Sequence, residues 1–182
     1  MTEAIVFLNG QLMPRSKASI SIMDRGFLFA DSVYEVIPVF EGEMFYPKQH
    51  LDRLIESLTH LKITNPYSLK RWMELFNFLI EDNQATAKPH KLYCQITRGA
   101  DTERTHKNHK TLKPTVYIEC RPIEAVGMTR LKQGYKAVLL EDKRWHNCHI
   151  KSTALLGNIM RLQQAQAHNA DEAILIRNNE LT

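Results

Sequence analysis

The sequence has 182 residues, of which 43% are hydrophobic and 24% are charged. This length suits one domain, or one domain with part of another, and the composition excludes a disordered chain. The formal net charge of +4 is too small to indicate a nucleic-acid-binding protein. Such a mild positive charge is equally compatible with anionic small-molecule ligands.

Cysteine content and apolar runs bear on the cellular compartment. The chain has three cysteines, an odd number, and no C-x-x-C motif, which favours a reducing compartment over a disulfide framework. The N-terminal apolar run over residues 4–8 is too short for a signal peptide. No stretch approaches the roughly 18 apolar residues that a membrane-spanning helix needs. We therefore expect a soluble, cytoplasmic protein without a membrane partner.

The first part of the chain alternates turn residues with short apolar runs, as antiparallel strands do. Asn9-Gly10 predicts a tight hairpin turn, because these residues accept positive φ angles, and Gly42 is expected to form a second turn. Residues 99–114 are polar and basic and predict a long loop, a kind of segment that is often functional. Strands are predicted at residues 4–8, 11–13, 34–40, 44–46, 91–98 and 115–121.

Two amphipathic helices are predicted between these strands. Pro47 is suited to the first turn of a helix, and leucines recur at helical spacing as far as Leu61. Asn65-Pro66 ends that helix, and a second apolar stripe follows over residues 69–80. Residues 1–121 are therefore expected to form an α+β domain with an antiparallel sheet and two helices.

A different pattern follows this first domain. Residues 122–127 are expected to be a linker, and residues 128–182 the first part of a second, α/β domain. Strands are predicted at residues 135–141 and 173–177, with a helix at 153–168 between them. Two strands and one helix are too few to bury a core of their own.

Lys151 lies where a strand-like segment gives way to the predicted helix. Ser152 or Thr153 is expected to cap that helix, and the positive end of its dipole would favour the neutral, nucleophilic amine. On local context alone, a solvated surface lysine is the more common outcome.

Four further residues have ordinary structural interpretations beside functional ones. Asp24 and Arg25 are expected to form a local ion pair in a turn, and Tyr34 resembles a core aromatic residue at the start of a strand. Arg53 falls off the apolar stripe of its helix and would be a solvated arginine. It would become a binding residue if an anionic group such as phosphate lay against that face of the helix.

The basic loop contains Arg104 and His106, which point the same way if the segment is extended and could clamp a carboxylate. A solvated basic loop is the ordinary alternative. Metal binding through His106 and His109, or through His146, Cys148 and His149, is another alternative, but neither cluster has the spacing of a four-ligand zinc site. We predict no metal site and, because the loop lacks interleaved aromatic residues, no nucleic-acid site.

The order and spacing of these motifs resemble those of the class IV pyridoxal-phosphate aminotransferases, and within that class the D-amino-acid (D-alanine) aminotransferases. The resemblance extends over nearly the whole chain. It is carried by Asp24-Arg25-Gly26, residues 31–36, residues 42–45, residues 50–54, Thr97-Arg98-Gly99, residues 141–145, Ile150-Lys151-Ser152, residues 155–157, residues 172–175 and residues 177–179.

The resemblance implies transamination between a D-amino acid, such as D-alanine, and a 2-oxo acid, with pyridoxal 5'-phosphate as cofactor. Lys151 would bind the cofactor covalently and transfer the substrate's α-proton. Arg53 would bind the cofactor phosphate. Tyr34, Arg104 and His106 would hold the substrate α-carboxylate, with the last two residues reaching across a homodimer interface. The incomplete class IV aminotransferase fold would be α+β.

Several alternatives stay open. The Arg104-x-His106 pair favours D-amino acids, but aminodeoxychorismate lyases and branched-chain-amino-acid aminotransferases belong to the same class. In relatives, a Glu that pairs with the cofactor's ring nitrogen follows the segment that ends here at Thr182, so we expect a truncated chain. An inactive domain that only dimerises or binds an anion is the alternative outside this class. Arg144 is expected to support the cofactor's surroundings.

Overall fold

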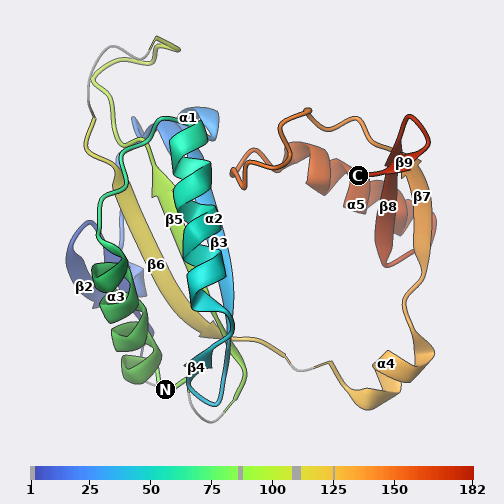
Figure 1. Cartoon of the computed structure of the whole chain (residues 1–182), viewed down its shortest axis with the longest axis horizontal. Coiled ribbons are helices and arrows are strands. Elements are labelled where there is room, and N and C mark those ends of the chain that lie inside the picture. Colours follow the sequence, from blue (N-terminus) through green and yellow to red (C-terminus); the bar gives the residue numbers. More distant parts are fainter. Residues whose placement is uncertain (1–2, 86–87, 108–111, 125) are drawn as a thin grey trace. The chain divides into compact units, whose positions relative to one another are not determined.

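A computed structural model of the chain describes residues 3–85, 88–107, 112–124 and 126–182 (Figure 1). The chain divides into two units. The first unit consists of Met1–Glu124 together with His149–Thr153, and the second of Ala125–Cys148 together with Ala154–Thr182. Lys151 is therefore part of the first unit, although it lies late in the sequence.

An antiparallel sheet forms the centre of the first unit. Its strands are β1 (Ile5–Leu8), β2 (Gln11–Pro14), β3 (Ser32–Phe40), β4 (Glu43–Met44), β5 (His90–Thr97) and β6 (Thr115–Pro122). They lie in the order β2-β1-β6-β5-β3-β4, and each neighbouring pair is antiparallel. The predicted α+β fold class with an antiparallel sheet is confirmed.

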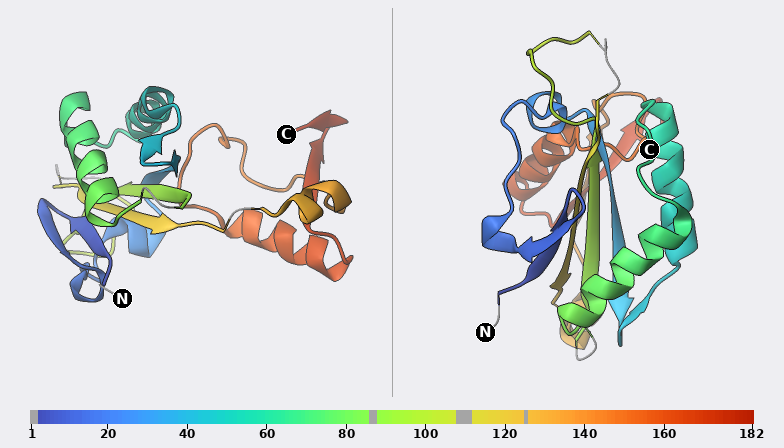
Figure 2. Two further views of the ribbon diagram at one scale, coloured as in Figure 1. Left: turned by 90° about the horizontal axis from the view of Figure 1, so that it is seen from below. Right: turned by 90° about the vertical axis from the view of Figure 1, so that its left-hand side faces the viewer.

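Helices α2 (Pro47–His60) and α3 (Leu69–Asp82) cover one face of this sheet (Figures 1 and 2). Pro47 lies in the first turn of α2, and the Ser68 side chain caps α3 by accepting a hydrogen bond from the Arg71 backbone N–H at 3.2 Å. Both predicted helices are confirmed. Their buried residues include Leu51, Leu54, Leu58, Trp72, Leu75, Phe76, Leu79 and Ile80.

Strand β3 shows how the pleat of the sheet separates two environments. Val33, Ile37 and Val39 are buried in the core beneath the helices. Because successive side chains point to opposite faces of a strand, Tyr34 lies on the face away from that core and Glu35 on the core side. The predicted interpretation of Tyr34 as a core aromatic residue is therefore wrong.

Before β3, the first unit also contains the short helices η1 (Arg15–Lys17) and α1 (Arg25–Phe29). The sequence patterns did not predict either helix. The Asp24 carboxylate caps α1 by accepting a hydrogen bond from the Gly26 backbone N–H at 2.8 Å, and it also accepts one from the Thr97 hydroxyl at 2.9 Å. Arg25 pairs with Asp31 at 2.9 Å, so the predicted local ion pair between Asp24 and Arg25 is wrong.

The second unit contains a β-α-β arrangement. Strands β7 (Ala137–Glu141) and β8 (Glu172–Arg177) are parallel and are connected through α5 (Leu156–Ala167). Strand β9 (Glu180–Leu181) adds antiparallel to β8, and α4 (Met128–Gln133) precedes β7. In the described parts of the chain, no helix combines the length and apolar character that crossing a membrane requires.

The helix predicted over residues 153–168 begins three positions later than expected, at Leu156. Its N-cap residue is Leu155, which makes no side-chain capping hydrogen bond. The prediction that Ser152 or Thr153 caps this helix is therefore wrong. Both residues instead make contacts with strand β3.

Two phenylalanines of α3 allow a matched test of this core. Phe76 is fully buried, whereas Phe78 is 43% exposed. Phe76→Ala should lower the free energy of unfolding by about 3–5 kcal/mol, because it leaves a cavity in the core. Phe78→Ala should lower it by no more than about 1 kcal/mol. Urea denaturation followed by circular dichroism measures both, and equal losses would contradict this account of the core.

Candidate active site

Lys151 is held against the beginning of strand β3 by backbone hydrogen bonds. The Tyr34 N–H donates to the Lys151 carbonyl at 3.0 Å, and the Thr153 N–H donates to the Ser32 carbonyl at 3.2 Å. Between them, Val33 and Ser152 form an antiparallel bridge. Strand β4 pairs only with the other end of β3, so this edge is available to the segment His149–Thr153. The segment therefore behaves as a short additional strand.

Side chains reinforce this pairing. The hydroxyls of Ser32 and Thr153 are hydrogen-bonded to each other. The Lys151 backbone N–H donates to the buried Ser57 hydroxyl of α2 at 3.3 Å. Next to Lys151, the His149 ring packs edge-on against that of His60, with 5.0 Å between ring centroids. The backbone of Lys151 is thus fixed by both the sheet and α2.

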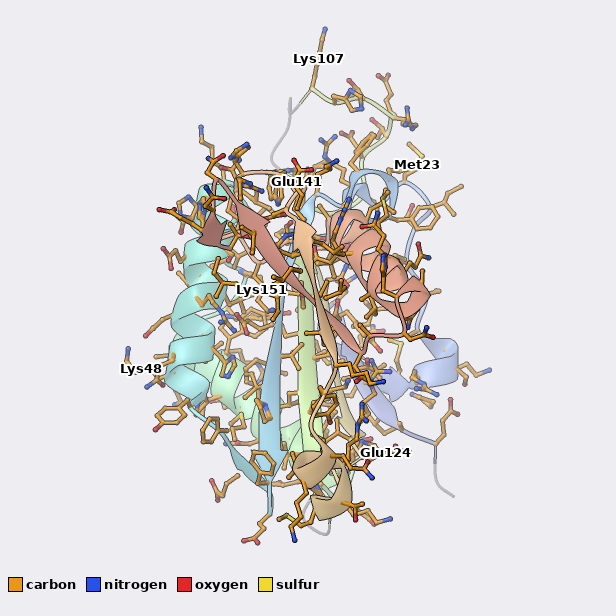
Figure 3. The ribbon with its side chains drawn as sticks, turned by 90° about the vertical axis from the view of Figure 1, so that its right-hand side faces the viewer. Met23, Lys48, Lys107, Glu124, Glu141 and Lys151 are labelled. Atoms are coloured by element: carbon orange, nitrogen blue, oxygen red, sulfur yellow. The ribbon has the colours of Figure 1, made fainter. Side chains whose placement is uncertain are left out.

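The amine of Lys151 lies over the ring of Tyr34, with Nζ 4.2 Å from the ring centroid (Lys151 is labelled in Figure 3). The expected helix dipole does not act on it as predicted, because α5 begins only at Leu156 and the effect fades beyond the first turn. The immediate surroundings of this amine are instead an aromatic face on the side of the sheet opposite to the helices.

Arg53 of α2 is bound to a buried carboxylate. Its Nε and Nη2 atoms donate to the two Glu35 oxygens at 2.5 and 2.8 Å. The Glu35 side chain is 1% exposed and the Arg53 side chain 50% exposed. Such paired, charge-assisted hydrogen bonds are among the strongest in proteins, and those that Arg53 donates to Glu35 raise the pKa of Arg53. Arg53 is therefore oriented, and the prediction of a merely solvated side chain is wrong.

His50, one turn before Arg53 on α2, completes this cluster. Its Nδ1 atom lies 2.9 Å from Glu35 Oε2. Sequence reasoning missed both Glu35 and His50. Glu35 could have been found, because it alternates with Val33 and Ile37 in a strand pattern whose buried positions are otherwise apolar. A charged residue at such a position needs a partner, and Arg53 supplies one.

Arg104 and His106 gather around a third side chain, the ring of Phe29 in α1. The guanidinium carbon of Arg104 lies 5.2 Å from the centre of this ring, and the His106 ring meets it edge-on at 5.0 Å between centroids. The structure thus brings these two predicted residues together. It does not place them in contact with Lys151 or Tyr34 among the interactions of the described residues.

The alternative of a metal site has no support in this part of the structure. His109 lies outside the described residues. His146 contacts Arg177, Cys148 donates to the Trp145 carbonyl, and His149 packs on His60. Across residues 3–85, 88–107, 112–124 and 126–182, no group of at least three His, Cys, Asp or Glu side chains is arranged to hold a metal ion.

A row of tyrosines extends from the candidate site along the same face of the sheet. Tyr34 stacks on Tyr93 with ring centroids 5.8 Å apart, and Tyr93 lies 6.4 Å from Tyr117. The Tyr93 hydroxyl donates to the Gln95 side chain at 2.7 Å. Burial raises the pKa of Tyr93 to about 12, so this hydroxyl stays protonated. The alternation of these strands could have indicated the row, which sequence reasoning missed.

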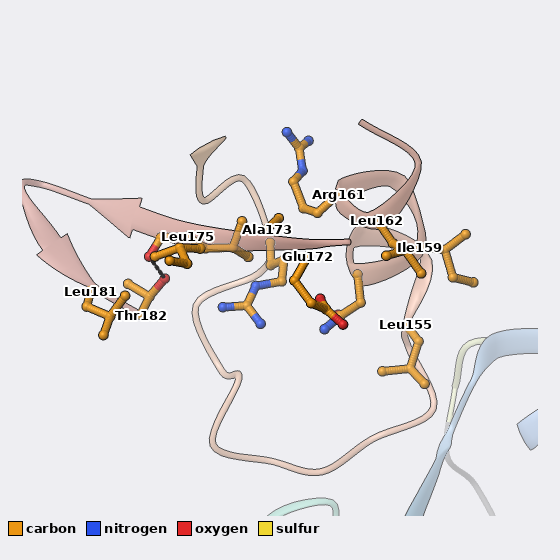
Figure 4. Close-up of a pocket in the computed structure, with 12 residues that line it drawn as sticks. Leu155, Ile159, Arg161, Leu162, Glu172, Ala173, Leu175, Leu181 and Thr182 are labelled. Atoms are coloured by element: carbon orange, nitrogen blue, oxygen red, sulfur yellow. Dashed lines mark hydrogen bonds between the residues drawn. The ribbon is translucent and has the colours of Figure 1, made fainter. Parts of the chain in front are cut away.

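The second unit has a pocket of its own between α5 and β8, which is shown in Figure 4. Its lining is largely apolar and includes Leu155, Ile159, Leu162, Leu175 and Leu181. Arg144 also lines it and is held by Asp142, to which its Nε and Nη2 atoms donate at 2.9 and 3.0 Å. These hydrogen bonds lower the pKa of Asp142, so that the pair is charged. The expectation that Arg144 supports a cofactor stays a prediction.

Comparison with known proteins identifies the family to which this arrangement belongs. The model of the amino-transferase class IV family matches residues 32–182. The chain belongs to the class IV aminotransferases. The resemblance predicted from its sequence motifs is thereby confirmed.

Curated relatives include the D-alanine aminotransferases of Listeria monocytogenes and Bacillus licheniformis. The first is 35% identical over 179 residues and the second 37% identical over 177 residues. Each alignment covers 97% of this chain and 61% of the relative. The chain thus spans about three fifths of the length of these curated relatives.

Solved structures of the class share the fold. The branched-chain amino acid aminotransferase of Escherichia coli superimposes with a TM-score of 0.86 at 21% identity, covering 98% of this chain and 61% of that one. A hypothetical aminotransferase of Mycobacterium tuberculosis in its PLP-bound form gives a TM-score of 0.75 at 19% identity. That alignment covers 97% of this chain and 63% of the other. At such low identities these structures support the fold alone.

The buried carboxylate of Glu35 can be tested with a matched pair of substitutions. Glu35→Gln removes the negative charge that faces Arg53 and His50, and should lower the free energy of unfolding by about 1–3 kcal/mol. Glu56→Gln changes an exposed residue of α2 and should cost less than about 0.5 kcal/mol. Guanidinium denaturation measures both values. If the two variants were equally stable, Glu35 would not hold Arg53 in the way described.

Proposed function

We propose that this protein is a pyridoxal-phosphate-dependent aminotransferase that acts on a D-amino acid, such as D-alanine, and a 2-oxo acid. The observation that carries the proposal is the position of Lys151. This chain belongs to the class IV aminotransferases. The amine of Lys151 lies on the ring of Tyr34, and the Lys151 backbone is paired with β3. A lysine held in this way suits a reaction that needs a fixed primary amine.

The residues of the first unit fit the cofactor's chemistry. Bound pyridoxal phosphate supplies an aldehyde that combines with amines and a ring that withdraws electrons from the substrate's α-carbon. Lys151 would attach it through Nζ. Arg53 would bind its phosphate, because Glu35 engages only Nε and Nη2 and the side chain is half exposed.

Lys151 and Tyr34 would act on the substrate itself. As a neutral amine, Lys151 Nζ would accept the proton that leaves the substrate's α-carbon. The Tyr34 ring limits where that amine can lie, since the two are in contact. The Tyr34 hydroxyl would donate to the substrate's α-carboxylate. The substrate would thus be held on the face of the sheet that α2 and α3 leave uncovered.

Arg104 and His106 would bind the same carboxylate from a second copy of the chain in a homodimer. Their positions are compatible with acting together, because both lie on the ring of Phe29. A guanidinium and an imidazole two residues apart offer several donors to one carboxylate. The sequence identity of 35% and 37% to two curated D-alanine aminotransferases supports a D-amino acid as substrate.

A cytoplasmic location is part of this proposal. Cys94, Cys120 and Cys148 are all free thiols, which is the state that a reducing compartment maintains. Cys94 and Cys120 are buried in the sheet of the first unit, where burial raises the pKa of each thiol. They therefore behave as core residues.

Transamination of a branched-chain L-amino acid is the second candidate. It is carried as a candidate because the class to which the chain belongs includes branched-chain enzymes such as that of E. coli, whose fold the chain shares. The two candidates differ in the hand of the substrate. A comparison of D-alanine with L-leucine, each with 2-oxoglutarate, therefore separates them.

The proposal predicts a visible-absorbance adduct when the purified chain is mixed with pyridoxal phosphate. Lys151→Ala should abolish the adduct, because it removes the reacting amine. Lys48→Ala is the matched control, since Lys48 is an exposed lysine of α2 whose partner is Asp52. That variant should form the adduct as the unsubstituted chain does.

The same preparation then tests the substrate. Added D-alanine should be converted to pyruvate in the presence of 2-oxoglutarate, whereas L-leucine should not react. Conversion of L-leucine alone would favour the second candidate. An adduct that persists in Lys151→Ala would overturn the assignment of the lysine, whatever the substrate.

A further inference from the structure

Arg25 is a buried arginine beneath the loop that carries Arg104 and His106. Its side chain is 7% exposed, and its Nη1 atom donates to the Thr105 carbonyl at 2.7 Å. Thr105 lies directly between the two residues proposed to bind the substrate carboxylate. A charged donor therefore holds the backbone of this segment at its central residue.

Phe29 provides the second attachment. The guanidinium carbon of Arg25 lies 5.1 Å from the centre of the Phe29 ring, and that of Arg104 lies 5.2 Å from the same centre. The His106 ring meets Phe29 edge-on. Arg25 thus supports the segment through the Thr105 backbone, and shares with Arg104 and His106 an aromatic ring that orients their side chains.

Asp31 fixes Arg25 from the other side. Its carboxylate accepts a hydrogen bond from Arg25 Nε at 2.9 Å, and two from Arg98 Nε and Nη2 at 2.7 and 2.9 Å. Burial alone would raise the pKa of Asp31, but the hydrogen bonds from both arginines outweigh burial and lower it. The carboxylate is therefore charged and holds both guanidinium groups in defined orientations.

The loop is also tied to α1 at its base. The Arg25 N–H donates to the Gly99 carbonyl at 2.9 Å, and the Asp101 N–H donates to the Met23 carbonyl at 3.1 Å. Gly99 has a φ of +104°, and a Cβ atom there would lie 2.0 Å from the Lys113 carbonyl oxygen. The base is closed tightly, whereas Lys107 marks the outer part of the loop in Figure 3. Beyond its base, the segment is contacted by Arg25 and Phe29.

We propose that Arg25 is a positioning residue for substrate carboxylate binding, because it sets the backbone and side-chain orientation of the Arg104–His106 segment. This inference rests on the proposed function and extends it to a residue that does not touch the substrate. Arg25 would act through Thr105 and Phe29. Its loss would weaken substrate binding in the partner's site and leave the attachment of the cofactor to Lys151 intact.

Arg98 offers a matched control within the same cluster. It shares the Asp31 carboxylate with Arg25 and is similarly buried, at 13% side-chain exposure. Its remaining donors, however, bind the Lys62 and Leu61 carbonyls after α2, at 3.0 and 2.7 Å. Removing Arg98 therefore perturbs the same partly buried carboxylate but none of the contacts that Arg25 makes with the loop segment.

The experiment compares Arg25→Met with Arg98→Met in the full chain. With D-alanine as substrate, Arg25→Met should raise KM by about tenfold or more, because charge-assisted hydrogen bonds to the segment are lost. Arg98→Met should leave KM unchanged. Both variants should form the pyridoxal-phosphate adduct as the unsubstituted chain does. Thermal denaturation of each variant measures its loss of stability. If Arg25 had only a structural role, Arg25→Met would lower the stability without raising KM.

Limited trypsin digestion supplies a readout that does not depend on activity. Trypsin can cleave after Arg104 within the segment and after Lys107 directly beyond it. Arg25→Met should accelerate cleavage at these two sites, whereas Arg98→Met should not. Equal cleavage rates, or an unchanged KM in an active Arg25→Met enzyme, would overturn the inference. If the unsubstituted chain neither binds pyridoxal phosphate nor converts D-alanine, the proposed function fails and the digestion alone decides whether Arg25 holds the segment.

Discussion

The pairing of His149–Thr153 with the beginning of β3 is the interaction on which the candidate site depends. Two backbone hydrogen bonds and the bond between the Ser32 and Thr153 hydroxyls hold a late segment of the chain on an early strand. Without this pairing, Lys151 would lie in a connection between secondary-structure elements, with no fixed direction for its amine. With it, Nζ lies on Tyr34, and the backbone is also bonded to α2 through Ser57.

The pleat of β3 then distributes the site over two faces of one strand. Tyr34 points away from the helices, and its ring contacts the amine of Lys151. Glu35 points toward α2 and is hydrogen-bonded to Arg53 and His50. A slip of one residue in the register between β3 and β5 would exchange these two faces. The long antiparallel register, from Ser32 opposite Thr97 to Val39 opposite His90, opposes such a slip. The geometry proposed for the cofactor thus depends on ordinary strand pairing.

Much of the fold followed from periodicity. The apolar spacing after Pro47 and Leu69 predicted α2 and α3, and the Asn9-Gly10 turn predicted the first hairpin, because these patterns reflect burial on one face. The start of α5 was misplaced, since Ser152 and Thr153 are good capping residues whose local preference yielded to pairing with β3. Helix α1 has five residues, which is too short to show a period.

Only part of the candidate site could be predicted, because local sequence patterns do not show which distant residues meet. Lys151, Tyr34 and Arg53 were proposed as site residues through the order of motifs, whereas their local context suggested surface or core roles. Contacts between residues distant in sequence could not be read from any local pattern. Arg25 reaches Thr105, which is 80 residues later in the chain, and Arg53 reaches Glu35, which is 18 residues earlier. Local reasoning therefore assigned Arg25 to its neighbour Asp24 and left Arg53 in solvent.

The identity of the reacting amine is the central claim, and it can be measured directly. The chain is mixed with pyridoxal phosphate, the adduct is reduced with borohydride so that the label becomes permanent, and tryptic peptides are sequenced by mass spectrometry. The account predicts a single labelled residue, Lys151, at stoichiometric occupancy. A label on another lysine, or one spread over exposed lysines such as Lys48, would contradict it.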